Sequence, residues 1–228
     1  MVKTVYLMLN DSPTSLTAER VKYLRGNHIP AILFSKGNLM EERSEVITNA
    51  IRMGFIIGNH TYSHPYLSQL TLEECAGEIE RTDRIIDRLY DEAGIVRPAK
   101  LFMFPFFDDG SGRSVLHASR LQRVLRDNGY QNIDTRGITY PFFRELSLDQ
   151  RTDVYCTLNF QEWKNPTEDE LVAKIDQPDN LFGGDLSDTT SADLYLMHDS
   201  EKTNPRLFYA IIDKLVARGI KFELPKFK

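Results

Sequence analysis

The sequence predicts an α/β fold in which parallel strands alternate with helices and close into a barrel. Short apolar runs and amphipathic helical patterns alternate along the 228-residue chain, as is typical of βα units wound around a parallel sheet or barrel. Eight apolar runs qualify as strands, the number in an α/β barrel. With 41% hydrophobic residues, the chain can bury such a core, so we expect one domain over residues 1–228.

The expected strands are short, apolar and bounded by turn-forming residues. They cover residues 5–9, 31–34, 55–57, 101–104, 131–133, 154–160, 194–197 and 221–224. The expected helices cover residues 16–25, 42–53, 72–90, 115–127, 168–175 and 206–218. Thr71 and Glu74 form a capping box before the third helix, and Asn204 with Pro205 begins the last one.

Two segments, residues 135–153 and 177–190, fit neither the helical nor the strand period and are expected to be loops. The first contains the aromatic residues Tyr140, Phe142 and Phe143. An exposed patch of that size needs a partner, so we expect it to cover the barrel mouth or to form a contact between subunits.

Composition argues against several functional classes. The formal net charge is −5, with Lys and Arg scattered, so nothing favours nucleic acid as a partner. No window approaches the roughly 18 consecutive apolar residues of a membrane-spanning helix. Residues 1–3 run into a strand without a signal peptide, so we expect a cytoplasmic chain or the mature form of an exported one.

Cys75 and Cys156 are expected to be buried free thiols. The sequence leaves the oligomeric state open.

Polar residues that suit a metal follow two of the expected strands. Asp11 comes after the first strand, and His60 and His64 come after the third. Histidines four apart share a face in a helical turn and can reach one ion. Two imidazoles and one carboxylate leave coordination positions open, which is the pattern of a catalytic metal site. The alternative is a capped loop with two surface histidines.

Five segments resemble, in order, the motifs of the polysaccharide deacetylases, the NodB-like carbohydrate esterase family 4. They are LNDSP at 9–13, IGNHTYSHP at 57–65, FPF at 104–106, EWK at 162–164 and LMHD at 196–199. The resemblance implies a distorted (β/α) barrel with seven or eight strands. It also implies metal-dependent hydrolysis of N-acetyl groups on a carbohydrate such as a chitin oligosaccharide or peptidoglycan.

The resemblance assigns roles to individual residues. It implies that Asp11, His60 and His64 bind a divalent metal that polarises the acetyl carbonyl and activates a water. Zinc suits these ligands best, with cobalt, nickel or manganese as alternatives. The backbone N–H of Phe106 would complete the oxyanion hole, and His198 would protonate the leaving amine. The alternative for His198 is an imidazole that serves only the core at a strand end.

The chain departs from the family pattern where the general base should be. Asn10 stands in place of that aspartate, and an amide cannot take a proton from water. Met103 replaces the arginine that pairs with the base. The two changes match, because a buried arginine without its carboxylate would be an unpaired charge. Asp108 and Asp109 are the remaining candidates for a base, or they belong to a solvated turn before the next helix.

The fourth motif is altered as well. Glu162 replaces the aspartate that orients the catalytic histidine, and its longer side chain can still reach His198. Trp163 either stacks on a sugar face in the substrate groove or fills the barrel rim.

We therefore expect a divergent deacetylase that acts on an acetylated carbohydrate, weakly because its usual base is absent. One alternative is a catalytically inactive deacetylase-like protein that binds carbohydrate or a protein partner, which Asn10 and Met103 favour. A second is an amidase for a small metabolite, which the long loops and the missing signal peptide favour.

Overall fold

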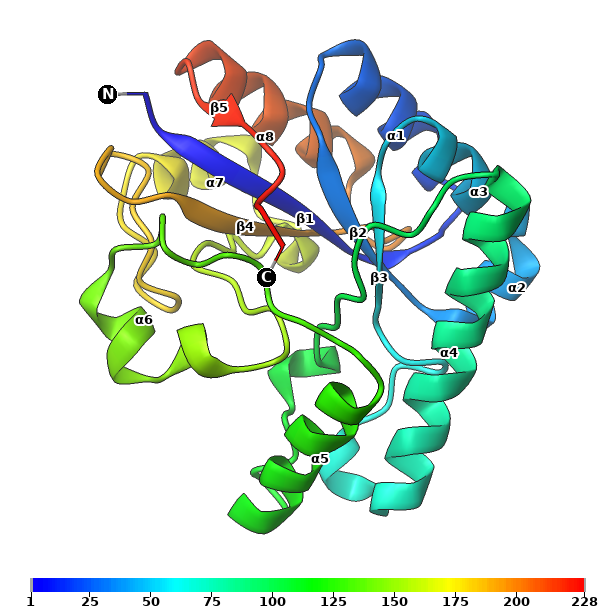
Figure 1. Ribbon diagram of the computed structural model, residues 1–228. Helices are drawn as coiled ribbons and strands as arrows, with labels where there is room; N and C mark the ends of the chain where they lie inside the picture. Colours follow the sequence, from blue (N-terminus) through cyan, green and yellow to red (C-terminus); the bar gives the residue numbers. More distant parts are fainter. Residues whose placement is uncertain (1, 228) are drawn as a thin grey trace.

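The computed structural model describes residues 2–227, and its strands form one parallel sheet with helices packed around it (Figure 1). The strands are β1 (Thr4–Ser12), β2 (Ala31–Ser35), β3 (Ile56–Asn59), β4 (Asp193–His198) and β5 (Lys221–Phe222). The helices are α1 (Thr17–Gly26), α2 (Gly37–Glu42), α3 (Ser44–Arg52), α4 (Leu72–Ala93), α5 (Val115–Asp127), α6 (Pro141–Glu145), α7 (Glu168–Ile175) and α8 (Pro205–Ala217). The predicted α/β class is confirmed.

Most helices lie where the sequence predicts them. α5 and α7 have the expected bounds, and the predicted Thr71 capping box begins α4. The helix expected at 42–53 is α3, and the short helix α2 before it was not expected; Arg43 between them leaves the helical conformation with φ −128° and ψ 43°. Between residues 2 and 227, no helix is both long and apolar enough to cross a membrane.

The sheet order is β3-β2-β1-β4, with β5 also paired to β1. Side chains alternate between the two faces of each strand, so the two faces of β1 pack against different neighbours. Val5, Leu7 and Leu9 share a buried cluster with apolar side chains of α1, α3, α4, α7 and α8. Met8 belongs to a second buried cluster, formed with residues of the irregular segments between α4 and β4. This second cluster occupies the place of a barrel interior.

Within residues 2–227 the sheet has five strands and does not close into the expected eight-stranded barrel, because three expected strands are irregular. Segments 101–104, 131–133 and 154–160 make only isolated bridges, which pair Asn59 with Phe102, Ile133 with Phe227 and Leu158 with Tyr195. The N–H of Val154 also donates to the carbonyl of Phe102 at 2.8 Å. Hydrogen bonding therefore continues from both edges of the regular sheet, and a turn with Pro105 and the left-handed Phe106 (φ 56°) follows directly after the first segment.

A buried ion pair ties the start of β1 to the irregular segments. Lys3 Nζ lies 2.6 Å from Asp193 Oδ2, and the two side chains are 3% and 0% exposed. The same ammonium donates to Tyr140 Oη at 3.1 Å, and to the carbonyls of Asp185, Asp188 and Ser191 at 2.8 Å each.

Tyr140 and Phe143 are buried in the inner core cluster. The expectation that these aromatic residues cover the barrel mouth or form a contact between subunits is therefore wrong for Tyr140 and Phe143. The segment, which includes α6, packs at the amino ends of β1 and β4, where Lys3 and Asp193 lie, and not at the carboxyl ends. Its aromatic side chains complete the core in place of regular strands.

Replacing Lys3 with methionine is expected to destabilise the fold by about 3–5 kcal/mol, because Asp193 would stay buried without its cation. Urea unfolding followed by circular dichroism measures the change. The double variant Lys3→Met, Asp193→Asn is expected to recover much of the loss, since it buries no charge. A Lys3→Met chain within about 1 kcal/mol of the natural one, the range of an exposed pair, would contradict this role.

Candidate metal centre and catalytic site

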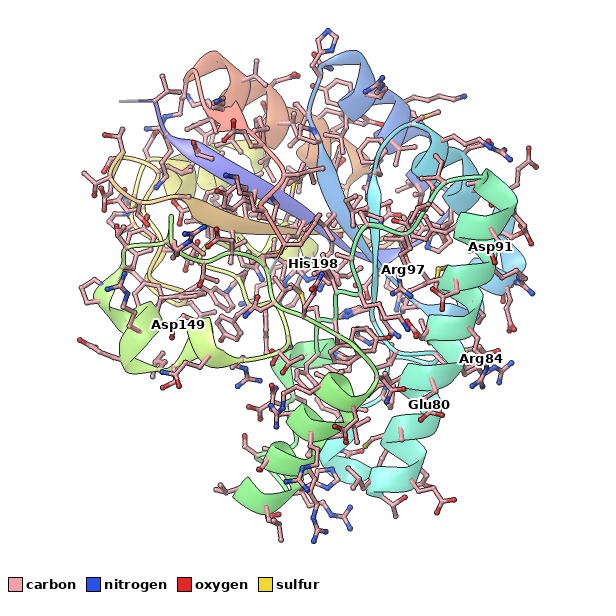
Figure 2. The ribbon with its side chains drawn as sticks, viewed as in Figure 1. Glu80, Arg84, Asp91, Arg97, Asp149 and His198 are labelled. Carbon is pink, nitrogen blue, oxygen red and sulfur yellow. The ribbon has the colours of Figure 1, made fainter. Side chains whose placement is uncertain are left out.

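The parallel register brings distant motifs to one edge of the sheet. Asn10 near the end of β1 is paired with His198 at the end of β4, which Figure 2 labels. On the other side of β1, Ser35 at the end of β2 is paired with Asn59, and His60 follows directly. Since the carboxyl ends of parallel strands face the same way, residues from three separate motifs meet there.

Asn59 holds the turn that carries the two histidines. Its Nδ2 donates to Tyr130 Oη at 2.6 Å and to the Ile79 carbonyl at 2.8 Å, and its Oδ1 accepts from the N–H of Thr61 at 2.8 Å. Thr61 and His64 are left-handed, with φ of 66° and 62°. The histidines are thus brought together by an irregular turn and not by the helical turn that their spacing suggests.

Asp11, His60 and His64 converge as predicted. Asp11 Oδ1 lies 3.2 Å from His64 Nε2 and 3.9 Å from His60 Nε2, and the two Nε2 atoms are 3.2 Å apart. Among residues 2–227, these three form the one cluster of histidine, cysteine and carboxylate side chains suited to an ion.

Burial sets the protonation of the cluster. Burial lowers the pKa of His60 to about 3 and also lowers the pKa of His64, so both are neutral at pH 7. Burial alone would raise the pKa of Asp11, but His60 and Lys36 are the leading causes that leave it below its usual value. The cluster therefore presents two neutral imidazoles and one carboxylate, the protonation states that metal ligands require.

The arrangement fits a bound cation. His60 Nδ1 donates to the carbonyl of Met103 at 2.8 Å, which leaves a lone pair on Nε2, the atom that faces the cluster. Asp11 Oδ1 is buried without a hydrogen-bond partner. Two electron-rich atoms that face each other in a buried site repel unless a cation lies between them.

Two neutral side chains, Asn10 and Met103, stand where the resemblance places the general base and its arginine partner. Asn10 is 4% exposed, and its Nδ2 lies 3.1 Å from Met103 Sδ and 3.4 Å from His60 Nε2. Asn10 Oδ1 is buried without a hydrogen-bond partner. Asn10 and Met103 are both neutral, so neither leaves an unpaired buried charge. This agrees with the prediction from the sequence that the two substitutions match.

His198 and Glu162 form the second half of the site. Glu162 Oε1 lies 3.0 Å from His198 Nδ1 and accepts the backbone N–H of His198 at 2.6 Å. Burial lowers the pKa of His198, but the charge and hydrogen bond of Glu162 outweigh burial and raise it above the usual value. The longer glutamate does reach the histidine, and it keeps Nε2 free to face the cavity.

A cavity of about 560 Å³ joins these groups, and most predicted site residues line it. Trp163 stands beside His198 with ring centroids 6.4 Å apart, and 46% of its surface is exposed. It therefore does not fill the core. Phe106 stacks on Tyr66 with centroids 4.1 Å apart and meets His64 edge-on at 4.5 Å.

The backbone of Phe106 is shaped by a 3₁₀ turn (Pro105–Phe107) in which Phe106 itself is left-handed. The two turn hydrogen bonds are made by the N–H groups of Phe107 and Asp108, at 3.2 Å and 2.9 Å. The N–H of Phe106 takes part in neither, as the predicted oxyanion donor requires.

Asp108 and Asp109, the alternative candidates for a general base, make contacts outside the site. Asp108 accepts the N–H of Ser68 at 2.8 Å, and Asp109 pairs with Arg151 at 2.8 Å. Neither lines the cavity of the metal cluster, so they serve the loop.

One charged residue at the site escaped the sequence reasoning. Lys36 Nζ lies 3.6 Å from Asp11 Oδ1, and Lys36 follows β2 at the same carboxyl edge. Its position after a strand was the available signal. Lys36 lines a second hollow of about 480 Å³, which shares Asp11, His64 and Phe106 with the first.

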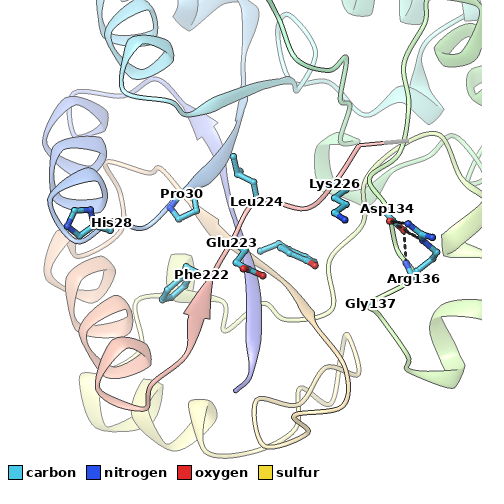
Figure 3. Close-up of a pocket in the computed structure, with 10 residues that line it drawn as sticks. His28, Pro30, Asp134, Arg136, Gly137, Phe222, Glu223, Leu224 and Lys226 are labelled. Carbon is cyan, nitrogen blue, oxygen red and sulfur yellow. Dashed lines mark hydrogen bonds and ion pairs between the residues drawn. The ribbon is translucent and has the colours of Figure 1, made fainter. Parts of the chain in front are cut away.

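A larger hollow of about 810 Å³ lies elsewhere, between the β5 region and residues 134–137 (Figure 3). Its charged residues include Asp134 and Arg136, which pair with each other at 2.6 Å. None of the predicted site residues lines it. Size alone therefore does not mark the candidate site.

Comparison with known proteins decides the family. A sequence profile described as polysaccharide deacetylase matches residues 1–133, which is more than half of the chain. This protein belongs to the polysaccharide deacetylase family. A peptidoglycan-N-acetylglucosamine deacetylase from Bacillus cereus is 31% identical over 86 residues, covering 37% of this chain and 31% of that protein. The match thus spans about a third of that relative's length.

Solved structures agree on the fold. A family 4 carbohydrate esterase from Streptomyces lividans, in complex with acetate, matches with a TM-score of 0.65 at 20% identity, over 97% of this chain and 92% of its own. A pseudoenzyme of the same family from Bacillus anthracis matches with a TM-score of 0.64 at 20% identity, over 97% of this chain and 63% of its own. The expected NodB-like, carbohydrate esterase family 4 fold is confirmed.

The pKa of His198 is expected to fall when Glu162 is replaced with glutamine, because the charge that favours the imidazolium is removed. NMR titration of the metal-free chain measures the midpoint, with His198→Gln used to assign the resonance. A folded pKa above the unfolded value means that protonation favours folding below about pH 6.5. The stability advantage of the natural chain over Glu162→Gln should therefore be largest at acid pH and shrink as pH rises through the folded pKa. An unchanged midpoint would contradict the coupling.

Proposed function

We propose that this chain is a metal-dependent hydrolase that removes N-acetyl groups from a carbohydrate, with Asp11, His60 and His64 as ligands. The observation that carries the proposal is the convergence of these side chains, as neutral imidazoles and an ionised carboxylate, at the junction of two hollows. Family membership supports the reaction, and the peptidoglycan deacetylase relative supports a glycan that contains N-acetylated amino sugars.

The shape of the site favours an extended substrate. The two hollows meet at Asp11, His64 and Phe106, so a chain of sugars can lie across both with one amide above the metal ligands. The exposed half of Trp163 offers a flat apolar surface for a sugar ring beside His198. A small amide metabolite needs no such groove, so we favour the glycan.

The residues of this chain divide the work as follows. A bound ion would supply Lewis acidity to the acyl carbonyl and to water. The N–H of Phe106 donates to the oxygen that becomes negative in the tetrahedral intermediate. Glu162 keeps the proton of His198 Nδ1, so that His198 Nε2–H can donate to the leaving amine. Tyr66 and Phe106 shield one side of the reacting amide from water.

Asn10 limits the rate, because no carboxylate stands ready to take a proton from the attacking water. Loss of a general base typically costs 10²–10⁴ in rate, so a slow enzyme is expected. Zinc is the first choice of metal because it suits imidazole and carboxylate ligands, and cobalt, nickel or manganese can replace it.

The second candidate function is a catalytically silent deacetylase that binds carbohydrate or a protein partner. Asn10 and Met103 favour it, since neither can act in proton transfer. The Bacillus anthracis pseudoenzyme is a precedent within the fold, and a mutant of that protein is described as having restored enzymatic activity.

The natural chain, loaded with Zn²⁺ or Co²⁺, is expected to release acetate slowly from chitin oligosaccharides or peptidoglycan fragments, as measured by mass spectrometry. Asp11→Ala should lose both metal and activity, because it removes the charged ligand. Asp176→Ala, at an exposed carboxylate, is the matched control and should keep both. Absence of product with every metal would remove the enzyme proposal.

Restoring the family residues separates the two candidates. The double variant Asn10→Asp, Met103→Arg is expected to accelerate the reaction about 10²–10⁴-fold, because it restores a base together with its charge partner. Asn10→Asp alone should gain less, since its carboxylate lacks the arginine. Activity that appears only in the double variant would mean that the natural chain is silent.

A further inference from the structure

Asn10 lies directly against a metal-ligand atom. Its Nδ2 is 3.4 Å from His60 Nε2, at the edge of the cluster that Asp11 and His64 complete. The side chain is buried, and its other contact is Met103 Sδ at 3.1 Å. Asn10 therefore lies next to the proposed metal ligands, in addition to standing at the position where the family has its general base.

The contact between Asn10 and His60 is incompatible with a bound cation. His60 Nδ1 already donates to the Met103 carbonyl, so Nε2 has a lone pair that the Asn10 amide hydrogen, an Nε2–H of His64 or a metal can take. An ion on Nε2 removes the acceptor from Asn10 and places a positive charge beside the NH₂ group. A 180° rotation of the Asn10 side-chain amide is then favourable, because it replaces the NH₂ group beside the ion with the carbonyl oxygen.

A second observation also indicates a missing partner. Asn10 Oδ1 is buried and accepts no hydrogen bond, and an unsatisfied buried carbonyl costs about 1–3 kcal/mol. Coordination of a divalent cation would satisfy it. Asn10 lines the same cavity as Asp11, His60 and His64.

The spacing agrees with a shared ion. Ligand atoms about 2.1 Å from a metal lie about 3.0–3.4 Å apart in octahedral and tetrahedral geometry. The amide end of Asn10 is 3.4 Å from His60 Nε2, and the Asp11–His64 and His60–His64 distances are 3.2 Å each. These three distances lie within this range, whereas Asp11 Oδ1 and His60 Nε2, which are 3.9 Å apart, would move closer to share the ion.

We propose that Asn10 is a fourth protein ligand, whose amide oxygen binds the same divalent ion as Asp11, His60 and His64. The proposal rests on the metal centre of the proposed function. It gives the asparagine a positive role, because a protein oxygen then occupies a position that would otherwise be open to water or substrate. A nearly closed site would hold its metal well and turn over slowly.

Calorimetric titration of the metal-free chain with Zn²⁺, and the visible spectrum of the Co²⁺ form, test the proposal. Asn10→Leu, which keeps the volume but has no oxygen, is expected to weaken zinc binding about 100-fold, at the upper end of the loss seen when a side chain that orients a metal ligand is changed. The cobalt bands, which depend on ligand number and geometry, should also change. Asn10→Ala, which also lacks the amide oxygen, is measured as well, so that the test still works if the leucine variant does not fold.

Two further variants complete the test. Met103→Leu removes the sulfur contact of Asn10 but no ligand oxygen, and is expected to bind zinc within about threefold of the natural chain. Asn10→Asp keeps an oxygen in place and should retain tight binding. Equal affinity in the natural, Asn10→Leu and Asn10→Ala chains would overturn the inference and leave the proposed function intact. Absence of zinc binding by the natural chain would overturn the metal centre, and the proposed function with it.

Discussion

The hydrogen bond from His60 Nδ1 to the carbonyl of Met103 controls the chemistry of the whole site. At 2.8 Å in a buried setting, it selects one tautomer and presents the Nε2 lone pair to Asp11 and His64. It also joins the histidine turn to the segment that ends in Phe106. The proposed ligand set and the proposed oxyanion donor therefore share one support, and a shift of either would misalign the other.

Charge balance explains how the chain tolerates its departures from the family. A carboxylate at position 10 and an arginine at position 103 would form a buried pair, and removing either partner alone would strand the other charge. Asn10 and Met103 are both neutral and lie in contact at 3.1 Å. Lys36 is then the cation nearest to Asp11 among the contacts of the described residues. The electrostatic field at the cluster thus differs from that of a member with the usual aspartate and arginine.

Backbone strain is concentrated at the same rim. Asp11, Thr61, His64, Phe106 and Gln161 all have positive φ without being glycine, a conformation that costs energy unless its surroundings enforce it. Each lies on a segment that carries a proposed metal ligand, the proposed oxyanion donor or the Glu162 turn. The packed sheet and the Asn59 hydrogen bonds hold these segments in place. The strained residues lower the stability of the fold, and in return they position the proposed functional groups.

The convergence of Asp11, His60 and His64 was predicted from strand ends, but the turn that joins the histidines is irregular and not the helical one that their spacing suggests. Local patterns in the sequence were sufficient for the bounds of α5 and α7 and for the α/β class, because periodicity is encoded by neighbouring residues. They failed for the strands at 101–104, 131–133 and 154–160 and for the buried Tyr140. They also missed the contacts of Lys36 with Asp11 and of Asn10 with His60. Each of these depends on packing between residues far apart in the chain, where burial and hydrogen-bond satisfaction outweigh local preference.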